Sequence, residues 1–179
     1  EWFEELMLTA QIFDKHWDIK GMPVFMPYGY FMHNQIMKLI EEAYAKIGCK
    51  MAQFPAFIPR QFLEREADHI KGFQKECFWH GDQMCLRPTS ETAMYHMFGT
   101  WVKSVDDLPL IIQQSCNVYR YETKNTRPLI RVREIPWNEI HSAHQTPEEA
   151  LETLEASWKG AYNVFDNHLS VHGLRLRRP

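Results

Sequence analysis

Apolar residues recur at helical spacing in four parts of the chain. The second run stops at Gly48, and the last one begins with a capping box at Thr146-Pro147-Glu148-Glu149 and should end by Gly173. The apolar positions of the four predicted helices are, in order, Trp2, Leu6, Ala10, Phe13 and Trp17; Ile36, Leu39, Ile40, Ala43 and Ile47; Met94, Met97, Phe98, Trp101 and Val102; and Leu151, Leu154, Trp158, Ala161, Phe165 and Leu169. We expect the last of these sets to be buried.

Other stretches have the composition of strands. Residues 116–121 and 130–135 are β-branched and aromatic, and the polar segment between them ends at Pro128, which predicts an antiparallel hairpin. Residues 51–59 are extended and apolar, and Pro55 restricts such a strand to a sheet edge or an interface. Helices combined with a hairpin, without regular βαβ units, predict an α+β fold.

Composition narrows the class of protein. The 179 residues are 45% hydrophobic with a pI of about 6.3, typical of one globular domain. Four cysteines without a CxxC pair favour neither a zinc ribbon nor a disulfide framework, and they fit a reducing cytoplasm. No run reaches the roughly 18 apolar residues of a membrane span. Because the chain begins at Glu1 without a methionine, we expect it to be a piece of a longer protein.

A local excess of positive charge stands out against a net charge of only -3 and predicts an anion site. Strand period places Arg120 and Glu122 on one face, while Pro136 should bend the second strand. The P-loop and GxGxxG patterns are missing, so arginine forks would have to grip phosphate. The basic residues of this region are Arg120, Lys124, Arg127, Arg131 and Arg133, and the residues that share parity in the second run are Arg131, Arg133, Ile135, Trp137, Glu139 and His141.

These residues carry a family resemblance. Arg120-Tyr121-Glu122, the loop after it and Arg131 resemble motif 2 of the class II aminoacyl-tRNA synthetases. Within that class, the sequence of this region is most similar to prolyl-tRNA synthetases of the archaeal and eukaryotic type. The segments Leu86-Arg87-Pro88-Thr89-Ser90-Glu91-Thr92 and His69-Ile70-Lys71-Gly72-Phe73, and the stretch WNEIHSAH from Trp137, resemble the same family. The similarity runs from about Trp17 to the end of the chain.

The resemblance implies a fold and an activity. Residues 1–179 would form a partial class II catalytic domain, with an antiparallel sheet flanked by helices, that activates L-proline with ATP and Mg2+ and transfers it to tRNA(Pro). The third motif, GxGxGxxR, and an anticodon-binding domain are missing from the 179 residues, and residues 77–86 look several residues short. We therefore expect the parent protein to be active and this piece alone to be feeble.

The resemblance also assigns roles at the nucleotide. Arg120 would hold the α-phosphate and stabilise the transition state, Glu122 would accept from the adenine amino group, and Arg131 would clamp the triphosphate. The alternative is that Arg120 and Glu122 form a weak ion pair on a solvated face of the sheet.

For proline, the resemblance makes Thr89 and Glu91 acceptors for the secondary ammonium. Trp137, Glu139 and His141 would close the far side of the pocket, and Phe73 would add a ring wall beside Trp137. The alternatives are an N-cap for Thr89, an ordinary first-turn acid for Glu91 and a core position for Phe73. Glu76 resembles a position near the substrate, or is a solvated loop charge.

Further alternatives remain open. The segment before and after Gly48 resembles motif 1, which implies a homodimer interface, but it also fits an edge strand buried in a monomer. Glu139, His141 and His144 could ligate zinc, although they do not spell HExxH. The whole chain could also be a non-catalytic synthetase-like module that binds amino acid or nucleotide, or a dimerisation module.

Overall fold

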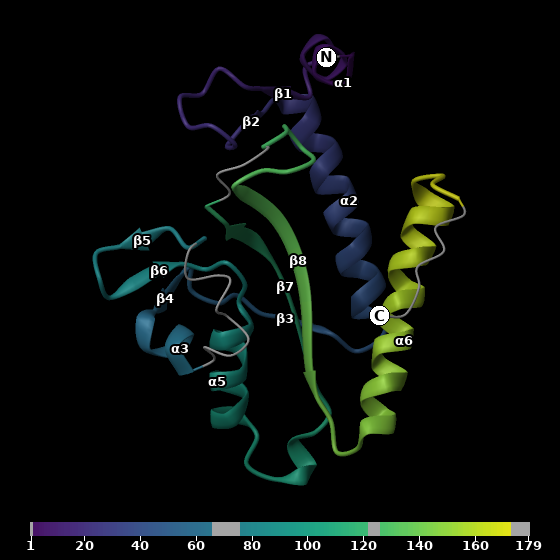
Figure 1. The fold of residues 1–179 in the computed structure, drawn as a ribbon. Coiled ribbons are helices and arrows are strands. Elements are labelled where there is room, and N and C mark those ends of the chain that lie inside the picture. The colour runs from purple at the N-terminus through teal and green to yellow at the C-terminus, as the bar shows by residue number, and fades with distance from the viewer. Residues whose placement is uncertain (1, 66–75, 122–125, 173–179) are drawn as a thin grey trace.

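The computed structural model describes residues 2–65, 76–121 and 126–172. Within them the chain forms a long antiparallel hairpin with helices on both sides and a second, small sheet (Figure 1). The elements are α1 (Trp2–Thr9), β1 (Phe13–Asp14), β2 (Val24–Phe25), α2 (Pro27–Ala45), β3 (Lys50–Met51), β4 (Phe57–Pro59), α3 (Arg60–Arg65), β5 (Trp79–His80), β6 (Met84–Leu86), α5 (Glu91–Trp101), the 3-10 turn η2 (Val105–Asp107), β7 (Leu110–Tyr119), β8 (Glu134–Ala143), α6 (Pro147–Asn163) and the π-helical turn η3 (Val164–His168).

The central sheet has the order β3-β7-β8. Strands β7 and β8 pair antiparallel from Leu110↔Ala143 to Tyr119↔Glu134, and β3 adds to β7 in parallel. Helix α5 lies on one side of this sheet and α2 and α6 lie on the other (Figure 1). The predicted α+β class, with an antiparallel sheet flanked by helices, is confirmed.

The predicted antiparallel hairpin forms, but the turn between its strands is longer than predicted. The second strand begins at Glu134 and not at residue 130, because residues 127–131 form a tight turn in which Leu129 has a φ of +61°. Arg131 and Arg133 therefore do not belong to the strand, and the predicted parity holds only from Ile135 onward. Pro136 does not break the strand, because β8 is an edge strand whose proline has no ladder partner to lose on its open side.

The two faces of the hairpin differ in what covers them. The face toward α5 forms a core with that helix, in which Phe54, Met94, Phe98 and Ile112 are buried. The face toward α2 carries Gln113, whose amide donates to the Glu41 carbonyl oxygen at 3.2 Å. Residues of β7 and β8 on the α5 face are Ile112, Gln114, Cys116, Val118, Ile135, Trp137, Glu139 and His141.

The first helix is shorter than the apolar spacing predicted. It ends at Thr9, and Gln11 has a φ of +54°, which turns the chain out of the helix. Phe13 is instead in β1, paired with Phe25 of β2 and almost fully buried, while Trp17 is 58% exposed in the connection. The expected helical face through Phe13 and Trp17 was therefore wrong.

The second helix agrees with its prediction. Helix α2 ends at Ala45, and Gly48 after it has a φ of +88°, a conformation that favours glycine. The predicted strand over residues 51–59 was wrong, because β3 and β4 belong to different sheets. Between β3 and β4, the backbone of Phe54 is hydrogen-bonded by side chains and not by a neighbouring strand. Gln114 accepts from Phe54 N–H, and Arg87 donates to the Phe54 carbonyl oxygen.

The last helix has the predicted start but not the predicted burial. Thr146 accepts from Glu149 N–H at 3.2 Å, and Gly160 packs closely against Ala43 of α2. Leu151, Leu154 and Trp158 are 55%, 57% and 38% exposed, because only the side of α6 that meets α2 is covered. The helix passes into η3 at Val164, and Gly173 lies outside the described residues.

A small sheet of order β4-β6-β5 precedes α5 in the chain, and helix α3, which follows β4, contacts α5. Ile58, Leu63, Cys77 and Cys85 form its buried cluster. All four cysteines are free thiols. Among the described residues, no helix is both long and apolar enough to cross a membrane.

Candidate functional site

A buried carboxylate lies at the centre of the α5 face. Oε2 of Glu139 accepts from Ser90 N–H and from the Thr89 hydroxyl, each at 3.4 Å, and it lies 3.1 Å from Nε2 of His141. Burial alone would raise the pKa of Glu139, but hydrogen bonds from His141 and Ser90 outweigh it and lower the pKa below its ordinary value. Glu139 is therefore charged at neutral pH, and protein donors surround it.

The turn before α5 brings Thr89 to this carboxylate. The N-cap of α5 is Ser90 and not Thr89, so the predicted cap was one residue early. Thr89 nevertheless accepts from Glu91 N–H at 3.4 Å, which fixes the turn. Glu91 is exposed in the first helical turn. Thr89 and Glu139 thus lie in contact, and Glu91 lies next to them with its side chain exposed.

Arg120 extends from the end of β7 toward the same turn. Its Nε donates to the Pro88 carbonyl oxygen at 3.2 Å, and its guanidinium carbon lies 5.4 Å from the centroid of the Trp137 ring. Stacking on an aromatic face and a backbone bond both restrict an arginine's rotamers. The structure therefore brings Arg120, Trp137 and the loop before Thr89 into one neighbourhood.

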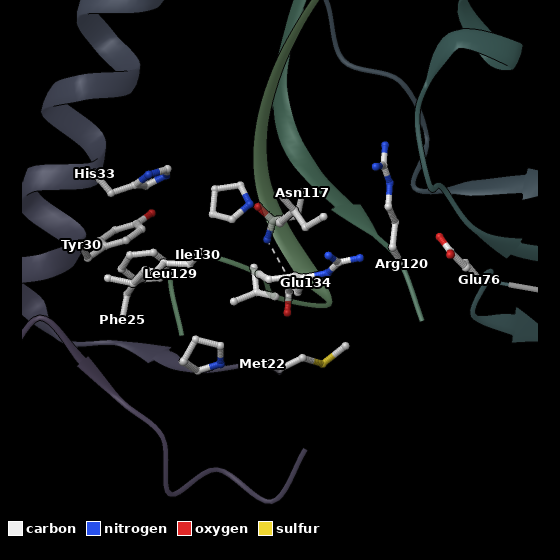
Figure 2. Close-up of a pocket in the computed structure, with 15 residues that line it drawn as sticks. Met22, Phe25, Tyr30, His33, Glu76, Asn117, Arg120, Leu129, Ile130 and Glu134 are labelled. Atoms are coloured by element: carbon white, nitrogen blue, oxygen red, sulfur yellow. Dashed lines mark hydrogen bonds between the residues drawn. The ribbon is translucent and has the colours of Figure 1, made fainter. Parts of the chain in front are cut away.

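Arg131 lies at the other end of the same region. It is exposed in the turn after the hairpin loop, where its backbone N–H donates to the Arg127 carbonyl oxygen at 2.8 Å. Arg120 and Arg131 both line one cavity of about 780 Å3, and Glu76 lies at its rim (Figure 2). The Glu76 carbonyl oxygen accepts from Tyr121 N–H, directly after Arg120.

The opposite wall of this cavity was not predicted. Figure 2 shows Phe25, Tyr30 and His33 across from Arg120, with Asn117 and Glu134 between them. The rings of Phe25 and His33 are 5.5 Å apart, and burial lowers the pKa of His33. Asn117 donates to Glu134 at 2.8 Å. Spacing could not reveal this wall, because α2 and β2 lie about 90 residues before the hairpin.

The cavity and the carboxylate cluster are separate spaces. None of the proline-site candidates within the described residues lines the cavity, and Arg120 is the residue that reaches both. Size alone would favour the cavity as the functional site, but the buried carboxylate Glu139 lies outside its lining. The described residues thus form two adjoining candidate sites, the carboxylate cluster around Glu139 and the cavity that Arg120 and Arg131 line.

Three residues of the carboxylate cluster escaped the sequence reasoning. Gln114 donates to Glu139 Oε1 at 3.4 Å and to the Ser90 hydroxyl at 2.8 Å, and the Tyr95 hydroxyl lies 3.3 Å from His141 Nδ1. A signal existed for Gln114, which is the one amide in the otherwise apolar alternation Ile112, Gln114, Cys116, Val118. Ser90 and Tyr95 carried no such signal.

Two predicted residues cannot be placed. Glu122, the expected adenine partner, and Phe73, the expected ring wall, lie outside the described residues. In the parts of the chain that the structure covers, no three His, Cys, Asp or Glu side chains are grouped as a metal site. Within those parts, both ring nitrogens of His144 are buried without a hydrogen-bond partner, and its ring is not joined to Glu139 and His141 in a ligand set.

Comparison with protein families gives a match over most of the hairpin and its surroundings. Residues 73–177 match the family model described as the tRNA synthetase class II core domain (G, H, P, S and T). Two curated relatives are the proline--tRNA ligases of Nanoarchaeum equitans and Pyrococcus abyssi. They are 45% and 47% identical to this chain, and each alignment covers 100% of the chain but 35% and 39% of the relative.

Solved structures agree with this match. A Giardia lamblia prolyl-tRNA synthetase in complex with prolyl-adenylate superposes with a TM-score of 0.89 at 51% identity, over 93% of this chain and 35% of that one. A Cryptosporidium parvum prolyl-tRNA synthetase with L-proline and AMP gives 0.84 at 29% identity, over 94% and 34%. The chain thus spans between a third and two-fifths of the length of these proteins.

Proposed function

We propose that this chain, which belongs to the class II tRNA synthetase core-domain family, supplies part of the active site of a ligase that joins L-proline to tRNA(Pro). The reaction would run through prolyl-adenylate, made from proline and ATP. Support comes from relatives named proline--tRNA ligase and from similar structures whose ligands are prolyl-adenylate or proline with AMP.

One observation carries the proposal: Arg120 is hydrogen-bonded to the turn that contains Thr89. Its Nε donates to Pro88 at 3.2 Å, so a guanidinium suited to phosphate adjoins the acceptors suited to an ammonium group. In the activation step the proline carboxylate attacks the α-phosphorus of ATP in line, and pyrophosphate leaves. Such a reaction needs positioning and charge stabilisation more than protein nucleophiles.

The proline end would be built by the cluster around Glu139. The secondary ammonium of proline has two N–H donors, and Thr89 and Glu91 offer oxygens on one side of it. Trp137 offers an apolar wall for the ring, and Phe73 belongs to this proposal through the family resemblance. Because protein donors already occupy Glu139, we assign this carboxylate chiefly to holding Thr89, Ser90 and His141 in place.

The ATP end would lie where Arg120 and Arg131 meet the cavity, with Glu122 as the adenine partner. ATP would arrive with Mg2+, an ion that commonly takes one or two carboxylates and completes its shell with phosphate oxygens and water. Glu76 and Glu134 are carboxylates at this cavity, so the site fits an ion held mainly by the triphosphate. Such an ion would neutralise charge on the leaving pyrophosphate.

We further propose that two copies associate through the segment that resembles motif 1, and that the protein works in the cytoplasm. Strand β3 lies at an edge of its sheet, and Met51 is 55% exposed there. An apolar edge of this kind is typical of surfaces that pair with another chain.

Exchange of labelled pyrophosphate into ATP by the full-length parent protein tests the activity. We expect exchange that depends on proline and is not supported by the other amino acids to a similar extent. Absence of proline-dependent exchange would overturn the ligase. If the parent still bound a stable prolyl-adenylate analogue, it would be a non-catalytic binding module, and if it did not bind, only the dimerisation role would remain.

A further inference from the structure

Gln114 is a fully buried amide to which the proposed reaction assigns no contact with substrate. It lies on the α5 face of β7, paired with Glu139 across the hairpin. Its Nε2 donates to the Ser90 hydroxyl at 2.8 Å and to Glu139 Oε1 at 3.4 Å, and its Oε1 accepts from Phe54 N–H at 2.5 Å. One side chain therefore joins the start of α5, strand β8 and the connection between β3 and β4.

The direction of this amide follows from chemistry. The Phe54 backbone N–H can only donate, so the group that faces it must be an acceptor. Glu139 is a carboxylate that accepts, so the group that faces it must be a donor. At neutral pH an amide offers both at the same place, and both ends are buried where an unmade hydrogen bond costs most.

Resting on the proposed ligase function, we propose that Gln114 is a positioning residue that fixes the orientation of Glu139 and His141 relative to the Thr89–Glu91 turn, two sides of the proline pocket that meet at Glu139. One side is the Thr89–Glu91 turn, which Gln114 holds through Ser90. The other is Glu139 with His141, which Gln114 holds through Glu139 Oε1. Because a small ring is recognised by contacts on both sides, the relative placement of these two sides determines which ring sizes fit.

The effect reaches beyond Glu139. Oε2 of the same carboxylate lies 3.1 Å from His141, and the other ring nitrogen of His141 lies 3.3 Å from the Tyr95 hydroxyl. A shift of Glu139 therefore moves the histidine that faces the substrate. Gln114 acts through these groups and does not itself touch proline.

The substitution Gln114→Glu isolates this role, because it keeps the shape and replaces the donor by a second carboxylate beside Glu139. We expect the parent protein carrying it to show a KM for proline raised about tenfold or more at pH 8, consistent with a lost buried hydrogen bond. The KM for ATP should stay within about twofold, because Arg120 and Arg131 are not held by Gln114. Preference for proline over the four-membered ring of azetidine-2-carboxylate should also fall.

The pH dependence separates positioning from general damage. Burial beside a like charge raises the pKa of the introduced carboxyl, so it becomes protonated as the pH falls toward 6, and its O–H can then donate to Glu139. The ratio of the proline KM of Gln114→Glu to that of the wild type should therefore shrink on acidification. A defect that is independent of the charge on this carboxyl would not recover in this way, and a loss of folding would appear in kcat and in the KM for ATP as well as in the KM for proline.

Gln113→Glu is the matched control. Gln113 directly precedes Gln114 in β7 and is equally buried. It faces α2, where its amide donates to the Glu41 carbonyl oxygen. We expect Gln113→Glu to lower thermal stability and to leave the proline KM and its pH dependence unchanged. If Gln114→Glu does not fold, Ser90→Ala, which removes the hydroxyl that accepts from Gln114, replaces it and should raise the proline KM in the same direction.

The outcomes distinguish the two proposals. A wild-type parent without proline-dependent exchange overturns the ligase function and this inference with it. An active parent whose Gln114→Glu and Gln113→Glu variants share the same proline KM overturns the positioning role alone. For the replacement variant, an unchanged proline KM in Ser90→Ala does the same.

Discussion

Nε2 of His141 lies 3.1 Å from Oε2 of Glu139, two residues earlier on the same face of β8. Their side chains are only 12% and 6% exposed, so water screens this contact little. The second ring nitrogen of His141 lies near the Tyr95 hydroxyl. Glu139, which hydrogen bonds from Thr89 and Ser90 hold in place, thus orients His141, whose ring borders the proposed substrate space.

The charge on Glu139 predicts a pH-dependent contribution to stability. Its pKa in the folded protein lies below the ordinary value of 4.5, because hydrogen bonds outweigh burial. A depressed pKa contributes stability above the unfolded pKa, and this contribution is lost as the pH falls through the folded pKa. Glu139→Gln should therefore lower the free energy of unfolding by about 1–3 kcal/mol at pH 7.

The difference between Glu139→Gln and the wild type should shrink as the pH falls below 4.5. Urea unfolding at pH 7 and pH 3.5 measures both values. Glu134→Gln is a control on the opposite face of β8. A difference that stays constant with pH would mean that the ionised form of Glu139 is not what the surrounding donors stabilise.

Arg120 and Glu91 should separate turnover from proline affinity. Arg120→Ala should reduce kcat of the parent by about 100-fold or more, because it removes a donor aimed at charge that develops in the transition state. Glu91→Ala should chiefly raise the KM for proline. The measurement is proline-dependent pyrophosphate exchange with proline and ATP varied in turn.

Arg60→Ala is the control for Arg120, because Arg60 also stacks on a tryptophan, with its guanidinium carbon 4.1 Å from the Trp79 ring centroid. Its loss should leave both constants near their wild-type values. Equal reductions of kcat and proline affinity in the Arg120 and Glu91 variants would refute the division of the site into a phosphate end and an ammonium end.

Gly29 should be intolerant of any side chain. A Cβ at this buried position in α2 would lie 2.0 Å from the Ile12 carbonyl oxygen, which already accepts from Met26 N–H. Gly29→Ala should therefore cost about 1–3 kcal/mol of stability, the usual range for overpacking. Gly99→Ala in α5 meets nothing within 4 Å and should gain about 0.5–1 kcal/mol. Thermal unfolding of both variants measures this contrast, and similar shifts would contradict it.

Met94 should carry much of the core between α5 and the sheet. It is fully buried with Phe98 and Ile112, so Met94→Ala should destabilise by about 2–5 kcal/mol. Leu151→Ala removes an apolar side chain of similar size at a position of α6 that is 55% exposed and should change stability by less than about 0.5 kcal/mol. Denaturant midpoints compare the two, and equal losses would mean that this core is not the stabilising one.

Local patterns predicted the elements whose stabilising contacts are also local. The capping oxygen of Thr146, the glycine after α2 and the alternation of Trp137, Glu139 and His141 all act within a few residues. The same logic failed at Phe13, where helical spacing continued past the end of α1. Pairing of Phe13 with Phe25, which no window around residue 13 contains, determined the strand.

The candidate site shows the same contrast between residues in one local motif and residues whose partners are distant in the sequence. Thr89, Arg120 and Trp137 could be proposed from the sequence because a family motif keeps their order along the chain. Gln114 was missed because its partners, Phe54, Ser90 and Glu139, come from three separate segments. The exposure of Leu151 and Leu154 was missed because apolar periodicity identifies a face without telling what covers it.

A structure of the parent protein with a non-hydrolysable prolyl-adenylate analogue tests the central claim most directly. The account predicts the proline ring beside Trp137 and His141, the ammonium group at Thr89 and Glu91, and the phosphate bound by Arg120. An analogue whose proline ring lies in the cavity against Phe25, Tyr30 and His33, away from Glu139, would contradict it.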